Sequence, residues 1–350
     1  GVFTKYRTKT LEVGDGSAVA EPGVYYRDFE KPTLAHGEQI LPSYPASREL
    51  AALGGMVNNN AGGERTLEYG KTEDYVEELE VVLSDGTVTT FKALDADELA
   101  EKKKLETLEG RIYREMDELL TKHATAIAAA KPKVTKNSAG YALWNVKDES
   151  KGTFDLAQLV TGAQGTLALT TKMRMRLIEN QGYRSMIVIF LSDIAQLPEA
   201  VRRVLPYNPE SFESYDDHTL SLAVKLMPGL LAQMGFWRAM RLGFSFLPQT
   251  FMALTGGIPK LVLMAEFSED THEEALEKAS AASAALTDLK LPTRVLPDER
   301  ASEKYWIVRR ESFALLRKNA KGLYAAPFID DFVVPPDAIP EFWPKLAALL

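Results

Sequence analysis

Residues 54–63 read Gly54-Gly55-Met56-Val57-Asn58-Asn59-Asn60-Ala61-Gly62-Gly63, a stretch with four glycines and three asparagines. Such a composition disfavours a regular helix or strand, because each glycine loses more conformational freedom on folding than other residues do. Glycine also lets a backbone pass close to a ligand, since no Cβ intervenes, and Asn offers both a hydrogen-bond donor and an acceptor. The stretch therefore predicts a ligand-contacting loop, with a tight structural crossover as the alternative.

A second glycine loop, Gly162-Ala163-Gln164-Gly165-Thr166-Leu167, leads into β-type sequence at 166–178. Alone it is a weak signal, because Gly-rich turns also serve purely structural purposes. Two such loops in one domain reinforce each other, and we expect them to lie side by side around one cleft. The segment 42–70 around the first loop is rich in Gly, Asn, Ser and Pro, which predicts irregular structure throughout.

The surrounding segments predict a first domain that mixes strands and helices. Asp15-Gly16 and Asp85-Gly86 mark hairpin turns, because Asp-Gly supplies the positive φ angles of tight turns. Strands are expected at 10–13, 18–20, 75–83 and 88–91, and helices at 26–34, at 155–160 and across 96–130 with a break near Gly110.

The pattern changes after Gly182. Apolar β-type runs at 186–191 and 260–267 are each followed by a helical pattern, at 193–204 and 273–286. Strand–helix units that recur in this way predict a separate α+β domain, with a boundary at about residue 180.

The segment 224–257 is apolar and aromatic but is interrupted by Pro228, Pro248 and several glycines. It lacks a clean run of about 20 apolar residues, so a transmembrane helix is not predicted. Helices that cover the sheet of the second domain are the favoured interpretation, and a peripheral membrane or partner contact is the alternative.

Composition argues against several classes of protein. The chain has 350 residues, a net charge of −8 and no cysteine. A nucleic-acid partner is not expected, because phosphate binding needs clustered Lys and Arg, and the lack of cysteine argues against disulfides and iron–sulfur ligands in this segment. We expect a cytoplasmic protein, with the surface of the inner membrane as the alternative location.

Familiar cofactor and metal motifs find little support. Gly70-Lys71-Thr72 resembles the end of a phosphate-binding P-loop, but Arg65 stands where the pattern requires Gly. No G-x-G-x-x-G follows a predicted strand, which argues against a nicotinamide site. The four histidines are not paired at ligand spacing, so no metal site is predicted.

The order of motifs along the chain is similar to that of one family of flavoproteins. The first half contains Pro45-Ala46-Ser47, Gly54-Gly55, Asn60-Ala61-Gly62-Gly63, Tyr69-Gly70, Asp74-Tyr75-Val76, Ser84-Asp85-Gly86, Asn137-Ser138-Ala139-Gly140-Tyr141 and Gly162–Leu167. The second half contains Val308-Arg309-Arg310-Glu311-Ser312 and Asp330-Asp331-Phe332-Val333-Val334-Pro335. In combination they resemble vanillyl-alcohol oxidase type FAD proteins, in the branch of D-lactate dehydrogenase, glycolate oxidase and D-2-hydroxyglutarate dehydrogenase.

The resemblance implies a fold class and a domain organisation. It implies an α+β chain, with the second subdomain of a PCMH-type FAD-binding domain at 1–180 and a cap domain with a helix-covered antiparallel sheet at 181–350. It also implies FAD as the cofactor. The residues expected to bind FAD are Pro45, Ser47, Gly54, Gly55, Asn59, Asn60, Gly62, Gly63, Tyr69, Gly70, Gly162, Gly165, Thr166 and Leu167.

The chain departs from the family pattern at Gln164, where Glu is usual, and at Ala168, where Gly is usual. Glutamine keeps the hydrogen-bonding shape of Glu without its charge, so the expectation of FAD stands. The family's Gly-rich pyrophosphate loop would precede Gly1. Its His-rich motif, which would supply the proton-accepting base and in some relatives a metal site, would follow Leu350. The chain is therefore expected to be part of a longer protein and to hold FAD only weakly by itself.

The implied activity is oxidation of a small D-2-hydroxy acid, of the D-lactate, glycolate or 2-hydroxyglutarate class, by hydride transfer to FAD. A substrate carboxylate calls for a planar bidentate donor, which is Arg. Arg310 matches the family motif, with Arg309 as the spare candidate and a surface ion pair as the alternative role for Arg310. Tyr141 is expected to line the pocket or to belong to the core.

Two other functions stay open at this stage. One is a non-catalytic flavin-fold subunit of a glycolate-oxidase-like complex, and the other is a membrane-associated scaffold that uses residues 224–257. The electron acceptor of the enzyme is left open between a quinone, a cytochrome and a flavoprotein.

Overall fold

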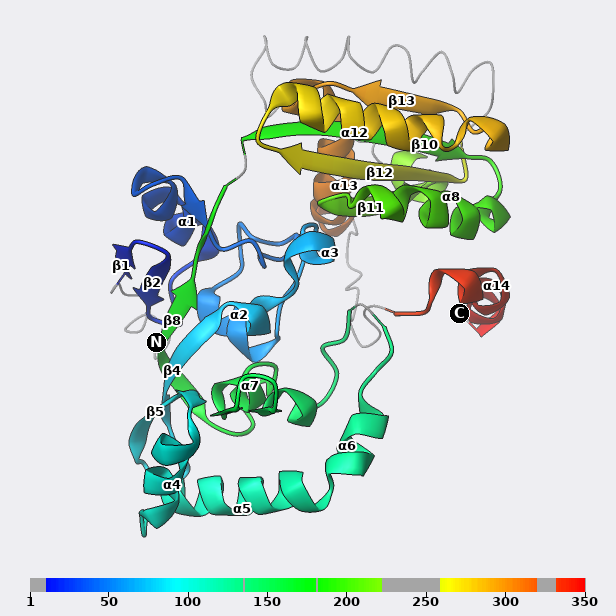
Figure 1. The fold of residues 1–350 in the computed structure, drawn as a ribbon. Helices are drawn as coiled ribbons and strands as arrows, with labels where there is room; N and C mark the ends of the chain where they lie inside the picture. Colours follow the sequence, from blue (N-terminus) through cyan, green and yellow to red (C-terminus); the bar gives the residue numbers. More distant parts are fainter. Residues whose placement is uncertain (1–10, 135, 181, 222–258, 320–331, 350) are drawn as a thin grey trace. The chain divides into compact units, whose positions relative to one another are not determined.

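The computed structural model describes residues 11–134, 136–180, 182–221, 259–319 and 332–349 (Figure 1). The chain divides into two compact units, Gly1–Asn180 and Gln181–Leu350. The predicted segment 224–257, whether sheet cover or membrane contact, lies outside the described residues.

Unit 1, residues 1–180, is built on a seven-stranded sheet in the order β1-β2-β8-β4-β5-β7-β6, in which every described pairing is antiparallel. The strands are β1 (Leu11–Gly14), β2 (Ser17–Ala20), β4 (Val76–Val82), β5 (Val88–Leu94), β6 (Lys147–Asp148), β7 (Thr153–Asp155) and β8 (Leu169–Arg176). The short strands β3 (Gln39–Ile40) and β9 (Ile178–Glu179) pair separately. Both predicted hairpins are confirmed, because β1 pairs with β2 and β4 pairs with β5.

The path of β8 brings the second glycine loop to the centre of unit 1. This strand begins directly after that loop and lies between β2 and β4 in the sheet (Figure 1). Its Met173 and Met175 are buried beside Leu79 and Val81 of β4 in one core. Because β8 joins strands far away in the sequence, tertiary pairing sets the position of the loop that precedes it.

Three helices, not two, occupy the stretch 96–130: α4 (Ala96–Lys104), α5 (Leu108–Lys122) and α6 (Ala124–Ala130). The predicted break near Gly110 is wrong, because Gly110 lies inside α5. The chain instead breaks before Thr107, whose side chain caps α5. A Cβ on Gly110 would lie 2.0 Å from the carbonyl oxygen of Leu105, so glycine is needed there for close approach.

The prediction that residues 42–70 are irregular throughout is also wrong. Two short helices lie within them, α2 (Leu53–Asn58) and α3 (Thr66–Tyr69). Helix α2 forms despite its glycines because Leu53, Met56 and Val57 are buried in the core of unit 1. The helix predicted at 26–34 is confirmed as α1 (Tyr26–Ala35), and α7 (Ala157–Val160) lies within the one predicted at 155–160.

Unit 2, residues 181–350, contains a four-stranded antiparallel sheet in the order β11-β12-β10-β13. Its strands are β10 (Tyr183–Leu191), β11 (Ser211–Asp216), β12 (Leu261–Glu269) and β13 (Thr293–Leu296). The helices are α8 (Leu197–Val204), α12 (His272–Ala284), α13 (Glu299–Asn319) and α14 (Ile339–Leu349). The expected α+β class and the antiparallel sheet of the second half are confirmed.

Both faces of this sheet are covered by helices, which explains why its central strands are continuously apolar. Ile187 and Ile189 of β10 face a core that includes residues of α8 and α12, whereas Met186 and Val188 face one that includes residues of α13 (Figure 1). Among the described residues, no helix combines the length and the apolar character needed to cross a membrane.

Candidate functional site

The two glycine loops lie side by side in unit 1, as predicted. We refer to Gly54–Gly63, whose first five residues belong to α2, as loop 1 and to Gly162–Leu167 as loop 2. The N–H of Gly162 donates to the carbonyl oxygen of Val57 at 2.9 Å, and the N–H of Gln164 donates to that of Asn58 at 2.8 Å. Gly162 has φ +86° and Gln164 has φ +54°, so loop 2 enters the left-handed region where it meets loop 1.

The glycines of loop 1 differ in what requires them. A Cβ on Gly54 would lie 2.4 Å from Pro22 Cβ, and one on Gly63 would lie 2.2 Å from the carbonyl oxygen of Tyr44. Both are therefore needed for packing inside unit 1, as the crossover alternative holds. A Cβ on Gly55 or on Gly165 of loop 2 would meet no atom within 4 Å. These two glycines leave open space where a ligand could approach the backbone.

The asparagines of loop 1 also separate by role. Asn60 is 3 % exposed with φ +46°, and both groups of its amide bond to Glu73. The Asn60 amide is therefore engaged with Glu73 inside unit 1. Asn59 is exposed. Asn58 donates from Nδ2 to the carbonyl oxygen of Gly54 at 2.7 Å, while its buried Oδ1 has no hydrogen-bond partner among the described residues.

Tyr141 lies beside loop 2 and not in the core. Its side chain is 45 % exposed, and its hydroxyl lies 2.9 Å from the hydroxyl oxygen of Thr166. Because the Thr166 hydroxyl donates to the carbonyl oxygen of Ala163, Tyr141 is the donor in this pair. The core alternative for Tyr141 is thus wrong, and its contact with loop 2 is consistent with a role at the cofactor.

The remaining predicted FAD residues of the first half surround loop 1. The Cα of Pro45 would lie 3.0 Å from a Cβ on Gly63, so the 45–47 turn packs against the end of the loop. Ser47 is exposed in that turn. Tyr69 accepts a hydrogen bond at its carbonyl oxygen from the Tyr75 hydroxyl, and Gly70 has φ +73°.

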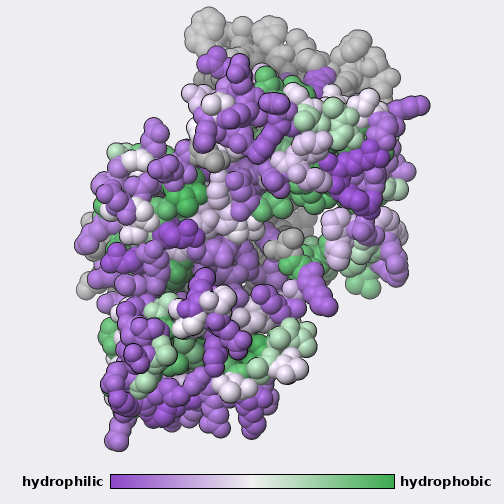
Figure 2. Space-filling view, viewed as in Figure 1, coloured by the Kyte–Doolittle hydropathy of each residue, from purple (hydrophilic) through white to green (hydrophobic). Residues whose placement is uncertain are grey.

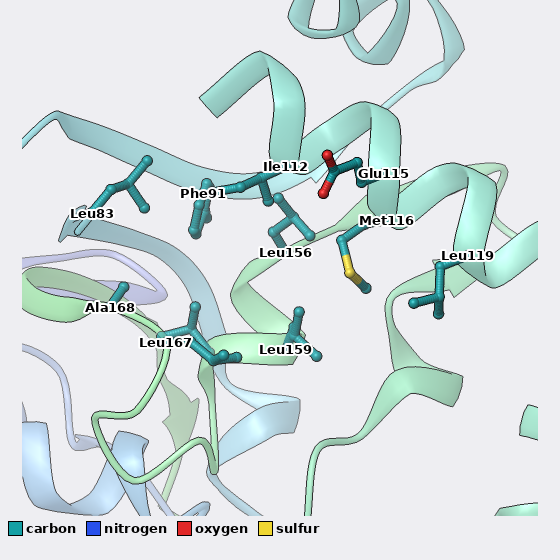
Figure 3. Close-up of a pocket in the computed structure, with 11 residues that line it drawn as sticks. Leu83, Phe91, Ile112, Glu115, Met116, Leu119, Leu156, Leu159, Leu167 and Ala168 are labelled. Carbon is teal, nitrogen blue, oxygen red and sulfur yellow. The ribbon is translucent and has the colours of Figure 1, made fainter. Parts of the chain in front are cut away.

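An apolar pocket opens on the other side of loop 2, with a volume of about 290 Å³ (Figure 3). Leu167 and Ala168 form one wall, and Ile112, Met116 and Leu119 of α5 form the opposite wall. Figure 2 shows apolar side chains interrupting the hydrophilic surface at the level between α5 and α7. The only charged residue in the lining is Glu115, so this pocket does not suit a phosphate or a carboxylate.

Both candidate substrate arginines lie on α13 in unit 2. Arg310 is exposed, and its Cζ lies 4.6 Å from the centre of the Trp306 ring. The indole N–H of Trp306 donates to Glu266 Oε1 at 3.0 Å, which anchors the ring to β12. Arg309 is half-buried and its Nε donates to Glu213 Oε2 at 3.0 Å. Arg309 thus contacts a carboxylate of β11, and Arg310 contacts the ring of Trp306.

Charged groups are buried elsewhere in unit 1 and in unit 2. Burial raises the pKa of Asp155 to about 6, although the N–H of Ala157 donates to its carboxylate. In unit 2, Arg184 bonds to the fully buried Glu210 at 2.9 Å and to Glu299. Within the described part of the chain, no cluster of His, Asp or Glu is arranged to hold a metal ion.

Sequence reasoning missed Glu73, Lys71 and Asn145, which meet beside Asn60. No motif marks Glu73 or Asn145, and Lys71 falls in the Gly70-Lys71-Thr72 stretch that was set aside. Asn58 belongs to the quoted loop, but only its orphaned oxygen distinguishes it from its neighbours.

Features of this site fit the edge of a flavin. A flavin ring presents N–H and C=O groups along one edge and an apolar face. The partnerless Asn58 Oδ1 could accept from such an N–H, and the open backbone at Gly55 and Gly165 admits a flat group.

Two protein families match this chain in separate regions. Residues 3–92 match the family described as FAD binding domain, and residues 181–350 match the C-terminal domain of FAD linked oxidases. Among solved structures, alkyldihydroxyacetonephosphate synthase shares the fold with a TM-score of 0.55 at 15% identity, over 88% of this chain and 46% of that one.

Curated relatives carry the names of 2-hydroxy-acid dehydrogenases. D-2-hydroxyglutarate dehydrogenase of Escherichia coli is 26% identical over 99% of this chain and 34% of its own length. The enzyme of that name in Haemophilus influenzae is 27% identical over 92% of this chain and 30% of its own. D-lactate dehydrogenase of Archaeoglobus fulgidus is 25% identical over 98% of this chain and 58% of its own. The chain thus spans about a third of the length of the first two relatives.

Proposed function

We propose, from the premise that this chain belongs to the FAD-linked oxidases, that the protein oxidises a small D-2-hydroxy acid with FAD as its cofactor. The two matched regions support this membership, and so do relatives named D-2-hydroxyglutarate dehydrogenase, D-lactate dehydrogenase and glycolate oxidase subunit GlcD. The observation that carries the proposal is the hydrogen-bonded contact between loop 1 and loop 2, which joins two flavin-type motifs about a hundred residues apart.

The division of work between protein and cofactor follows from the chemistry. FAD, when bound, accepts the hydride that leaves the α-carbon of the substrate. The chain's own residues bind and orient the two reactants. Loop 1 and loop 2 would hold the cofactor through open backbone and through Asn58 Oδ1, with Tyr141 beside them.

The substrate brings a carboxylate, which a planar guanidinium binds with two parallel hydrogen bonds. Arg310 is the residue that we assign to this role. Contact with an aromatic ring and bidentate binding of a carboxylate are compatible for a guanidinium, and Arg310 Cζ lies 4.6 Å from the centre of the Trp306 ring. The electron acceptor that reoxidises the flavin is a separate partner, of the quinone, cytochrome or flavoprotein class.

The test is reduction of the bound flavin by substrate. The full-length protein is reconstituted with FAD and mixed without oxygen with D-2-hydroxyglutarate, D-lactate or glycolate, and with the L enantiomers of the first two as controls. We expect the visible flavin absorbance to bleach with at least one of the three acids and to persist with the L enantiomers. Flavin that binds but is bleached by none of the acids would favour a non-catalytic flavin-fold subunit instead.

A further inference from the structure

Glu73 gathers polar groups from several segments of unit 1. Its Oε2 accepts from Asn60 Nδ2 at 2.6 Å and from Asn145 Nδ2 at 3.1 Å, and its Oε1 lies 2.9 Å from Lys71 Nζ. Its backbone N–H donates to Asn60 Oδ1 at 3.0 Å, and its carbonyl oxygen accepts from Gln158 Nε2 at 3.0 Å. Loop 1, the 3₁₀ turn Thr72–Asp74, the turn Leu143–Asn145 and α7 are therefore tied to one residue.

These contacts hold Asn60 in a conformation that it would otherwise leave readily. Asn60 has φ +46°, a left-handed backbone that non-glycine residues adopt only at an energetic cost. Both groups of its amide bond to Glu73, so a single partner fixes the side chain and the backbone that carries it.

Asn60 in turn is the point at which three segments meet. Its carbonyl oxygen accepts from the Ser138 hydroxyl at 3.1 Å, and a Cβ on Gly162 of loop 2 would lie 3.2 Å from its own Cβ. Lys71 adds a second tie, because its Nζ also donates to the carbonyl oxygen of Asn137. The 137–141 segment then reaches loop 2 through the bond from Tyr141 to Thr166. A closed circuit of hydrogen bonds thus runs from Glu73 through loop 1, residues 137–141 and loop 2.

The charge of Glu73 matters as well as its shape. The side chains of Glu73 and Lys71 are only 13% and 12% exposed, so each ion needs its partner. Two amide groups and one ammonium converge on the carboxylate as donors. A glutamine would keep the volume but turn an NH₂ group toward donors, which leaves buried groups mispaired.

We propose that Glu73 is the positioning residue of the FAD site: by holding Asn60 and Lys71 it sets the shape of loop 1 and, through residues 137–141, of loop 2. This assignment rests on the proposed function, because it takes the two loops to be the FAD-contacting surface. Glu73 itself touches neither FAD nor substrate in this role.

The experiment compares two buried carboxylates of unit 1 in the full-length protein. Glu73→Gln removes the acceptor at the loops. Glu109→Gln is the matched control. Glu109 lies on α5, is 8% exposed and accepts from Lys102 Nζ at 2.5 Å and from Thr89 Oγ1 at 2.7 Å, outside this circuit. For each protein, FAD affinity is measured by quenching of flavin fluorescence, and the unfolding midpoint is measured without FAD.

We expect Glu73→Gln to weaken FAD binding by about tenfold or more, which corresponds to about 1.4 kcal/mol. Both variants should lower the unfolding midpoint to a similar extent, but Glu109→Gln should leave the FAD Kd within about twofold of wild type. Hydrogen exchange should quicken at 137–141 and 162–167 in Glu73→Gln alone. If Glu73→Gln does not fold, Lys71→Met serves in its place, since it removes one donor to Glu73 and the tie to Asn137.

The outcomes separate the two proposals. Wild-type protein that binds no FAD would overturn the proposed function. Wild-type protein that binds FAD, together with a Glu73→Gln or Lys71→Met variant of unchanged Kd and unchanged exchange at the loops, would overturn the positioning role alone. Equal losses of FAD affinity in Glu73→Gln and Glu109→Gln would also overturn it, because the loss would then follow stability and not position.

Discussion

Replacing Asp155 by Asn should stabilise unit 1 at neutral pH. Asp155 is 9% exposed, and burial raises its pKa from an ordinary 3.8 to about 6. A carboxyl with a raised folded pKa contributes stability that is fully present below pH 3.8 and is lost as the pH rises through about 6. This rise in the pKa of Asp155 means that its ionisation lowers the free energy of unfolding by about 3 kcal/mol at pH 7 and above.

Asparagine keeps the oxygen that accepts from the Ala157 N–H at 2.8 Å, so the start of α7 should survive the change. Its NH₂ group would face the Gln158 donors that also bond to the carboxylate, and this offsets part of the gain. Asp155→Asn should therefore be more stable than wild type above pH 7 by up to about 3 kcal/mol, and similar to it near pH 4. The assay is native-state hydrogen exchange of the β5 amides at pH values from 4.5 to 8, because Ala93 and Leu94 of β5 pair with β7, where Asp155 lies.

Asp148→Asn provides a control of opposite sign. The bond from the Ser150 side chain lowers the pKa of this exposed carboxyl. Its contribution is present above the unfolded pKa and is lost as the pH falls through the folded pKa, so the substitution should destabilise slightly at neutral pH. An Asp155→Asn protein that is equal to or less stable than wild type at pH 8 would refute the assignment of a raised pKa to Asp155.

Three further predictions concern packing, substrate binding and buried charge. Gly54→Ala should lower the free energy of unfolding in urea by about 1–3 kcal/mol, because its Cβ would lie 2.4 Å from Pro22 Cβ. Gly55→Ala faces open space and should change it by less than about 1 kcal/mol. Equal effects of the two changes would contradict this difference in packing. Arg310→Ala should lower kcat/KM of the FAD-reconstituted full-length enzyme by about a hundredfold, or about 3 kcal/mol, with unchanged flavin content, and Arg310→Lys should recover part of the loss. Arg309→Ala is its control, and a severe loss there with a mild one at Arg310 would transfer the carboxylate-binding role to Arg309. Arg184→Met should lower the stability by about 3–5 kcal/mol, because it removes the ion-pair partner of the fully buried Glu210. A second change, Glu210→Gln, should restore part of the loss. A thermal unfolding midpoint unaffected by the single change would rule out a stabilising buried ion pair.

Local signals predicted both hairpins and the longer strands of this chain, but not β3, β6, β7, β11 or β13. The Asp15-Gly16 and Asp85-Gly86 turns join paired strands, because the backbone angles of these turns depend on residues within them. The apolar run at 186–191 predicted a strand, and the structure shows β10 there, with all but its first residue buried. The helix breaks were less predictable. Gly110 predicts a helix break, yet it lies inside α5. The glycine is there because the carbonyl oxygen of Leu105 comes too close to leave room for a side chain.

The candidate site was predictable as a pair of loops but not as a network. Local composition by itself predicted glycine-rich, ligand-contacting stretches at 54–63 and 162–167 and an α+β second half, because backbone freedom and hydrophobic periodicity are local properties. The expectation of a flavin came from the resemblance of the motifs in combination. Only the tertiary structure decided that Asn60 bonds to Glu73, that the buried Asn58 Oδ1 has no partner among the described residues and that Tyr141 contacts Thr166. Glu73 lies 13 residues from Asn60, 72 from Asn145 and 85 from Gln158 along the chain. Hydrogen bonds over such separations form only once the tertiary fold has brought these segments together, which no local pattern encodes.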